Sequence, residues 1–203
     1  SVHSYENEIA QGFITVSGGH RAGIAGSAAI SGNRVLAVKY INSINFRIAS
    51  QINGCADRIY MELFKDKLCS VLIAGAPSSG KTTVLKDLCR QLGERYSVSV
   101  IDERGEIGAV YHGKAQNDVG SMCDIFDGYP KACGLRTALR VMSPEIAVCD
   151  EIGGDDDIEQ LISCANSGVR IAASAHAGSI EELYLRPDIR TLLENRVFDY
   201  IVM

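Results

Sequence analysis

The loop around which this chain is organised reads Gly75-Ala76-Pro77-Ser78-Ser79-Gly80-Lys81-Thr82, and Thr83 follows it. Its two glycines and its Lys-Thr pair have the spacing of a Walker A phosphate-binding loop. An apolar, β-prone run precedes the loop at 70–74, and apolar residues recur at helical spacing over 84–92. The sequence therefore predicts a strand, a loop and a helix in succession, an arrangement that binds phosphate with backbone N–H groups and a helix N-terminus.

This loop predicts ATP and Mg²⁺ as cofactors. All nine residues from Gly75 to Thr83 are candidate nucleotide-binding residues. The Lys81 ammonium is expected to reach the β- and γ-phosphates, and the Thr82 hydroxyl is expected to ligate Mg²⁺.

A second predicted strand, at 145–149, ends in the acidic pair Asp150 and Glu151. An apolar strand that ends in Asp-Glu downstream of a Walker A loop has the pattern of a Walker B motif. Asp150 is expected to hold Mg²⁺ through water, and Glu151 to orient or deprotonate the attacking water. The glutamate favours hydrolysis over nucleotide binding alone, because a kinase would need a site for its own acceptor.

Polar residues also follow two further predicted strands. The strand at 96–101 is followed by three acids within 102–106, at the edge where open α/β sheets bind ligands. Glu103 is a candidate catalytic acid of this cluster, although such clusters also occur in polar turns. The strand at 169–175 is followed by His176, a candidate γ-phosphate sensor, whereas isolated histidines are otherwise usually surface or core residues.

The order of strands and helices predicts an α/β fold, a RecA-like P-loop ATPase core with a mainly parallel sheet. We expect a helix at 55–67 before the loop strand and a long excursion at 108–134, where Gly, Asp and Pro are frequent. A single helix is expected at 180–193, before a closing strand at 197–203.

The composition limits the classes of function. The 203 residues suffice for one α/β domain with an appended region, and the apolar fraction of 46% is typical of globular proteins. A net charge of −5 gives no indication of nucleic-acid wrapping or of a basic membrane-binding surface. The seven cysteines lack metal-binding spacing, so we expect reduced and mostly buried thiols. No apolar run is long enough to span a bilayer, and no signal peptide is visible, so a cytoplasmic protein is expected.

The first fifty residues predict a small antiparallel sheet that precedes the nucleotide-binding part. Its strands are expected at 12–16, 20–26, 35–40 and 44–49. We therefore expect a partial N-terminal β region at 1–52 and a P-loop ATPase domain at 53–203. Because the chain opens on a serine, we expect it to be a fragment of a longer protein. On pattern alone, the arginines of these strands are ordinary solvated residues.

Four motifs occur in a fixed order, at 75–82, 101–106, 150–151 and 174–176. In this order they resemble the Walker A, Asp-box, Walker B and His-box series of the secretion ATPases of type II and type IV systems. The resemblance covers most of residues 70–180. It implies a ring-forming ATPase, a hexamer by analogy, whose N-terminal strands supply arginines to the nucleotide phosphates. On that ground Arg21 and Arg47 become candidate catalytic residues.

Four further stretches narrow the resemblance, at 18–26, 44–49, 102–104 and 124–131. They resemble the sporulation members of this superfamily, the cytoplasmic ATPases of a channel between mother cell and forespore in endospore-forming bacteria. This resemblance implies membrane proteins of the channel complex as partners and a peripheral location at the mother-cell membrane through them. It implies neither direct membrane insertion nor a nucleic-acid partner.

Three other functions are open to a P-loop chain. A nucleic-acid-binding ATPase is disfavoured by the acidic balance and by the lack of a basic stretch interleaved with aromatic residues. A nucleotide-gated scaffold with negligible turnover stays open, and measured phosphate release separates it from an enzyme. A small-molecule kinase is disfavoured by the Asp150-Glu151 pair and by His176.

Overall fold

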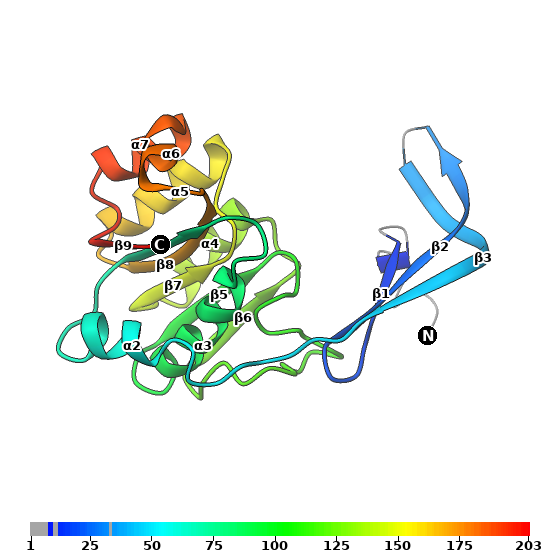
Figure 1. Cartoon of the computed structure of the whole chain (residues 1–203), viewed down its shortest axis with the longest axis horizontal. Helices are drawn as coiled ribbons and strands as arrows, with labels where there is room; N and C mark the ends of the chain where they lie inside the picture. Colours follow the sequence, from blue (N-terminus) through cyan, green and yellow to red (C-terminus); the bar gives the residue numbers. More distant parts are fainter. Residues whose placement is uncertain (1–7, 10–11, 33) are drawn as a thin grey trace. The chain divides into compact units, whose positions relative to one another are not determined.

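The computed structural model describes residues 8–9, 12–32 and 34–203, and these form two units. The smaller unit contains the described part of residues 1–50 together with Ala109–Asn117. The larger unit contains Gln51–Gly108 and Asp118–Met203. The smaller unit carries a three-stranded sheet and the larger unit a six-stranded sheet (Figure 1).

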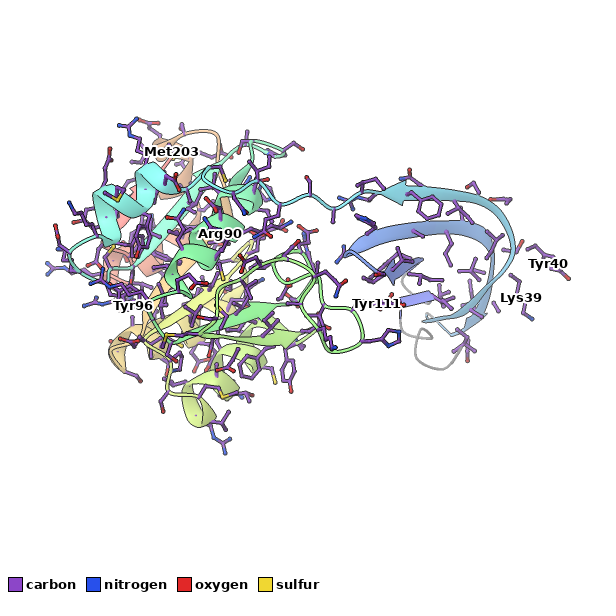
Figure 2. All side chains as sticks on the ribbon, turned by 90° about the horizontal axis from the view of Figure 1, so that it is seen from below. Lys39, Tyr40, Arg90, Tyr96, Tyr111 and Met203 are labelled. Atoms are coloured by element: carbon purple, nitrogen blue, oxygen red, sulfur yellow. The ribbon has the colours of Figure 1, made fainter. Side chains whose placement is uncertain are left out.

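The sheet of the smaller unit is antiparallel throughout. It consists of β1 (Phe13–Val16), β2 (His20–Ser31) and β3 (Arg34–Arg47). The predicted break between strands at 35–40 and 44–49 is wrong, because β3 runs through it. The register between β2 and β3 shifts around Gly26, and Tyr40 has a positive φ of 48°. These features are those of a β-bulge, which bends a strand without ending it. Tyr40 and Lys39 project outward there (Figure 2).

The segment 109–117, which lies far along the chain, packs on the β1–β2 turn. The Gly18 N–H donates a hydrogen bond to Gln116 Oε1 at 2.9 Å. Gly19 has a φ of 72°, and a Cβ at this position would lie only 2.5 Å from the Ala109 Cβ. Glycine is therefore required at residue 19 for both backbone conformation and close approach.

The sheet of the larger unit is parallel throughout, in the order β6-β5-β7-β8-β4-β9. Its strands are β4 (Val71–Gly75), β5 (Val98–Asp102), β6 (Cys123–Asp127), β7 (Ile146–Cys149), β8 (Arg170–His176) and β9 (Tyr200–Val202). Strand β8 lies between β4, which leads into the glycine-rich loop, and β7, which leads into Asp150. The carboxyl ends of these three strands therefore meet at one edge of the sheet.

Helices cover both faces of this sheet, as parallel sheets require (Figure 1). They are α2 (Asp57–Ile59), η2 (Tyr60–Phe64), α3 (Lys81–Leu92), α4 (Lys131–Val141), α5 (Asp155–Asn166), α6 (Ile180–Leu185) and α7 (Pro187–Glu194). Side chains alternate along each strand, so Val71 and Ile73 pack with α3 and η2. Leu72 and Ala74 pack in the other cluster, with α4, α5, α6 and α7.

The predicted α/β class with a RecA-like parallel core is confirmed, and three further local predictions are corrected. The excursion expected at 108–134 contains β6, which pairs with β5 at the edge of the sheet. The single helix expected at 180–193 is two helices, because Arg186 before Pro187 is extended and cannot continue α6. The helix expected at 55–67 is shorter, and most of it is the π-helical turn η2. Of the described helices, none is both long and apolar enough to cross a membrane.

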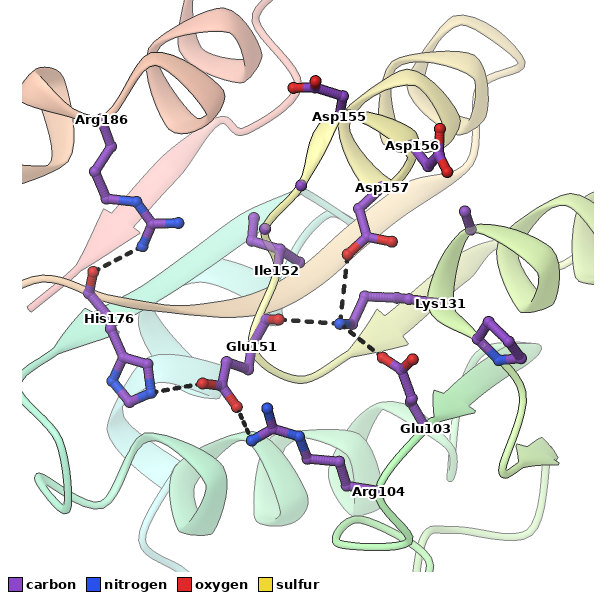
Figure 3. Close-up of a pocket in the computed structure, with 14 residues that line it drawn as sticks. Glu103, Arg104, Lys131, Glu151, Ile152, Asp155, Asp156, Asp157, His176 and Arg186 are labelled. Carbon is purple, nitrogen blue, oxygen red and sulfur yellow. Dashed lines mark hydrogen bonds and ion pairs between the residues drawn. The ribbon is translucent and has the colours of Figure 1, made fainter. Parts of the chain in front are cut away.

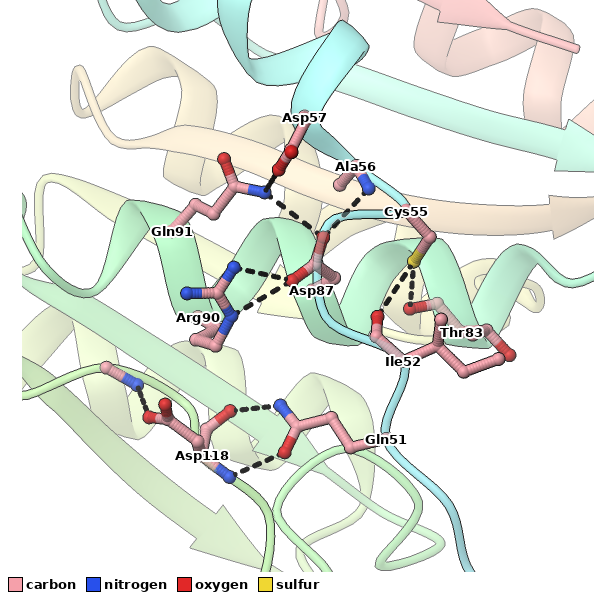
Figure 4. Close-up of polar contacts among 11 residues, drawn as sticks. Gln51, Ile52, Cys55, Ala56, Asp57, Thr83, Asp87, Arg90, Gln91 and Asp118 are labelled. Atoms are coloured by element: carbon pink, nitrogen blue, oxygen red, sulfur yellow. Dashed lines mark hydrogen bonds and ion pairs between the residues drawn. The ribbon is translucent and has the colours of Figure 1, made fainter.

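A buried carboxylate, Asp87 of α3, fixes the chain where it enters the larger unit (Figure 4). Its Oδ2 accepts the Ala56 N–H at 2.8 Å, and its Oδ1 accepts two N–H groups of Arg90, at 2.9 and 2.8 Å. Nearby, the Asp118 N–H donates to Gln51 Oε1 at 2.9 Å, and Gln51 Nε2 donates to the Asp118 carbonyl at 2.5 Å. These two hydrogen bonds join Gln51 and Asp118, which are the first residues of the two chain segments that form the larger unit.

Replacing Asp87 by alanine is expected to destabilise the larger unit by about 1–3 kcal/mol, because it leaves a buried N–H and Arg90 without their acceptor. Burial alone would raise the pKa of the Asp87 carboxyl, but the hydrogen bonds from Ala56 and Arg90 outweigh it and lower the pKa. A lowered pKa contributes stability above the unfolded value of about 3.9, and that contribution is lost as the pH falls through the folded pKa.

Urea denaturation at pH 7 and below about pH 4 measures this effect. The difference between wild type and Asp87→Ala should shrink at the acidic pH. Asp66→Ala, at an exposed carboxylate, is the control. An Asp87→Ala difference as small as that of Asp66→Ala at pH 7 would contradict the expectation.

Candidate active site

The glycine-rich loop joins β4 to α3 and has the backbone geometry of a phosphate cradle. Ser78 and Gly80 have positive φ values of 59° and 95°. A Cβ at Gly75 would lie 2.5 Å from Ser79 Oγ, so the loop closes tightly on its first glycine. The Lys81 side chain is buried and its Nζ donates to the Ala76 carbonyl at 2.7 Å. The lysine that is expected to bind phosphate therefore lies folded over its own loop.

Thr82 and Asp150 meet although they lie far apart in the sequence. Thr82 Oγ1 donates to Asp150 Oδ2 at 2.7 Å. Ser174 Oγ donates to the other oxygen, Asp150 Oδ1, and accepts the Glu151 N–H at 2.9 Å. A hydroxyl beside a carboxylate oxygen is a pair of hard oxygen donors, which fits the ligand preference of Mg²⁺. The residues present therefore fit the ion that the sequence predicts, with Ser174 orienting the carboxylate.

Glu151 follows Asp150 in a left-handed backbone conformation, with a φ of 51°. Its carboxylate contacts two cationic or polar partners, Arg104 Nη1 and His176 Nε2, the latter at 2.9 Å (Figure 3). A non-glycine residue in this conformation is strained by about 1–3 kcal/mol and persists where its surroundings hold it. Glu151 is thus a constrained carboxylate at the carboxyl end of β7, next to the last residue of β8.

These groups face a single cavity of about 320 Å³. It is lined by Ser78, Gly80, Lys81, Thr82, Thr83, Arg104, Glu106, Asp150, Glu151, Ser174 and His176. The cavity lies within the larger unit, and it brings together the predicted loop, the predicted acidic pair and the predicted histidine. Burial raises the pKa of the neighbouring Cys149 thiol to about 12, so this thiol stays neutral beside Asp150.

Asp102, the last residue of β5, and Glu103, which follows it, have different surroundings. Asp102 is buried and accepts backbone N–H groups from residues 106, 107 and 108, at 2.8, 3.1 and 2.8 Å. It therefore shapes the turn that follows it. Glu103 pairs with Lys131 Nζ at 3.2 Å and lines a neighbouring cavity of about 770 Å³. The catalytic role expected for Glu103 stays a prediction. Glu103 lines the neighbouring cavity and does not line the cavity that the glycine-rich loop borders.

Arg21 and Arg47 belong to the smaller unit. They are cross-strand neighbours of β2 and β3, and the Arg21 guanidinium lies 4.9 Å from the centroid of the Phe13 ring. Their approach to nucleotide phosphates stays a prediction.

Sequence reasoning missed three residues that the structure adds to this region, Ser174, Arg104 and Lys131. Ser174 and Arg104 stand inside the motifs at 174–176 and 101–106, Ser174 two positions before His176 and Arg104 directly after Glu103. A polar residue in the apolar strand β8 was the available signal for Ser174. Nothing in the local pattern around Lys131 indicated its contacts, which come from three distant segments.

Comparison with solved structures gives the class of this fold. The pilus retraction motor PilT with bound ADP superposes with a TM-score of 0.61 at 17% identity, over 85% of this chain and 51% of that chain. The Legionella pneumophila ATPase DotB superposes with a TM-score of 0.58 at 18% identity, over 82% of this chain and 45% of that chain. The chain thus spans about half the length of these structures, and it has the P-loop fold of the secretion ATPases.

Comparison of sequences gives the family. The stage III sporulation protein AA of Bacillus subtilis (strain 168) is 38% identical over 205 residues, covering 98% of this chain and 67% of that protein. The model of the family described as "Sporulation stage III, protein AA" matches residues 1–203. The chain belongs to this family.

Proposed function

We propose that this chain is the hydrolytic part of an Mg²⁺-dependent ATPase that acts as a motor for a sporulation channel between mother cell and forespore. The observation that carries the proposal is the convergence of Lys81, the Thr82–Asp150 pair and Glu151 on one cavity. Family membership supports the sporulation setting, and the secretion-ATPase fold supports a motor. The working form we propose is a cytoplasmic ring, a hexamer by analogy, docked on membrane proteins of the channel complex.

In this proposal each side chain has a separate task. The loop N–H groups and Lys81 bind the β- and γ-phosphates, which requires Lys81 to leave the Ala76 carbonyl. Thr82 and Asp150 would hold Mg²⁺, which neutralises developing charge on the phosphates. Glu151 takes a proton from the attacking water, and His176 Nε2 orients the Glu151 carboxylate.

A nucleotide-gated scaffold with little turnover is the second candidate, and one observation favours it. Both oxygens of the Glu151 carboxylate are engaged, one by Arg104 and one by His176. A carboxylate held in this way is less available as a base. In the proposed enzyme, nucleotide binding draws Arg104 toward the phosphates and frees one Glu151 oxygen.

Phosphate release over a range of protein concentrations, with oligomer size measured in parallel, tests the proposal. We expect release that requires Mg²⁺, is abolished by EDTA, and rises in specific activity as the protein assembles. The expected rise follows from arginines shared between subunits, which contribute about 10³- to 10⁵-fold in other arginine-finger systems. ATP-driven assembly without phosphate release would support the scaffold instead, and a fully active dilute monomer would refute shared sites.

A further inference from the structure

Lys131 occupies a position that local rules disfavour. It is the first residue of α4, where the helix dipole repels a positive charge, and no acidic residue stands in this first turn. Its side chain is nevertheless buried, with 8% of the residue exposed. A buried ammonium is stable only when oxygens replace its water shell, so its surroundings must compensate for both unfavourable effects.

Three oxygens from three segments surround the Lys131 ammonium (Figure 3). Nζ donates at 3.2 Å to Oε2 of Glu103, a residue that follows β5. It also donates at 3.0 Å to the backbone carbonyl of Glu151, a residue that lies after β7. It also lies 3.4 Å from Asp157 Oδ2, in the first turn of α5. Burial alone would lower the pKa of Lys131, but Asp157 and Glu103 outweigh it and the pKa is raised. The side chain therefore stays charged at neutral pH.

The contact with the Glu151 carbonyl has a specific consequence. Glu151 has a strained φ of 51°, which directs its side chain toward Arg104 and His176. Its N–H is held by Ser174 Oγ at 2.9 Å, and its carbonyl is held by Lys131. The peptide groups on both sides of this residue are thus fixed by side chains from other segments. Asp157 and Glu103 in turn fix the ammonium that holds the carbonyl.

We infer that Lys131 is a positioning residue, which holds the strained backbone of Glu151 so that its carboxylate points into the nucleotide cavity. This inference rests on the proposed ATP hydrolysis. Without the ammonium, the Glu151 peptide is free to relax toward an ordinary conformation, and its carboxylate moves away from the site of the attacking water. Displacements of about 1 Å in a catalytic group reduce turnover by up to about 100-fold.

Lys131→Met tests the inference, because methionine keeps much of the side-chain volume and removes the ammonium. We expect kcat to fall at least about tenfold, while ATP affinity stays within about threefold, because Lys131 does not line the cavity of the loop. Lys131→Arg restores a buried cation and should recover part of kcat. Asp157→Asn, which loosens the ammonium without removing it, should lower kcat by less than Lys131→Met. Lys67→Met, at an exposed lysine before β4, is the matched control.

Nucleotide affinity, kcat and circular dichroism are measured on every variant. An unchanged kcat for Lys131→Met, or equal losses of affinity and kcat, overturns the inference. Should Lys131→Met fail to fold, Asp157→Asn decides, and a wild-type kcat in this variant overturns the inference. Wild-type protein that binds ATP without phosphate release overturns the proposed function, and this inference falls with it.

Discussion

Replacing Glu151 by glutamine is expected to remove most ATP turnover and to leave ATP binding intact. Glutamine has nearly the same shape and keeps an oxygen for Arg104, but it cannot accept a proton from water. General-base catalysis contributes about 10²- to 10⁴-fold, and we expect kcat to fall by a factor in this range. Phosphate release and equilibrium binding of a fluorescent ATP analogue measure the two quantities separately.

Glu159→Gln is the matched control, because this exposed glutamate of α5 carries the same substitution away from the cavity. It should turn over at the wild-type rate. Undiminished turnover in Glu151→Gln would show that Glu151 is not the base. Weakened ATP binding would show instead that the Arg104 and His176 contacts shape the nucleotide site.

Replacing Lys81 by alanine is expected to weaken ATP binding strongly. A hydrogen bond to a charged partner is worth about 1.5–3 kcal/mol, so loss of the ammonium should lower affinity by about 10- to 100-fold. Within the described part of the chain, Lys81 Nζ donates only to a backbone carbonyl of its own loop, so the folded protein loses little without it. The expected signature is an unchanged melting temperature without ATP and a reduced stabilisation when ATP is added.

Lys86→Ala is the control for this prediction, since Lys86 lies five residues further along α3. It should retain the ATP-dependent rise in melting temperature. Equal losses in both variants would indicate a general effect of charge on the helix, and an undiminished rise in Lys81→Ala would contradict the assignment of Lys81 to the phosphates.

The sequence predicted the parts of the site that depend on local pattern. The loop at 75–82, the acidic pair and His176 each follow an apolar strand, and the ends of parallel strands meet at one sheet edge. That rule is enough to predict that Thr82 and Asp150 lie close together, although 68 positions separate them in the sequence. It could not give the strand order, in which β8 separates β4 from β7 and thereby places Ser174 beside Asp150.

The missed strand β6 and the missed bulge of β3 are features fixed by distant contacts, whereas the break between α6 and α7 follows from the local Arg186-Pro187 pair. Strand β6 was hidden in a Gly- and Asp-rich stretch, and its pairing with β5 decides its conformation. The bulge of β3 lies opposite Gly26 of β2, where a Cβ would come within 2.6 Å of the Lys39 carbonyl oxygen. Lys131 carries no local signal either, because Glu103, Glu151 and Asp157 converge on it only after β5, β7 and α5 have packed.

The docking of residues 109–117 on the β1–β2 turn bears on how this protein can be divided or recombined. The smaller unit is built from two pieces of the chain, with the nucleotide-binding motif between them. A chimaera of two homologues joined near residue 50 would combine the β1–β2 turn of one parent with residues 109–117 of the other. Gly19 of the first parent would then pack against the residue that the second parent has at position 109. Exchanging the unit intact requires two grafts. Substitutions in the turn and in residues 109–117 are therefore expected to covary during divergence of the family.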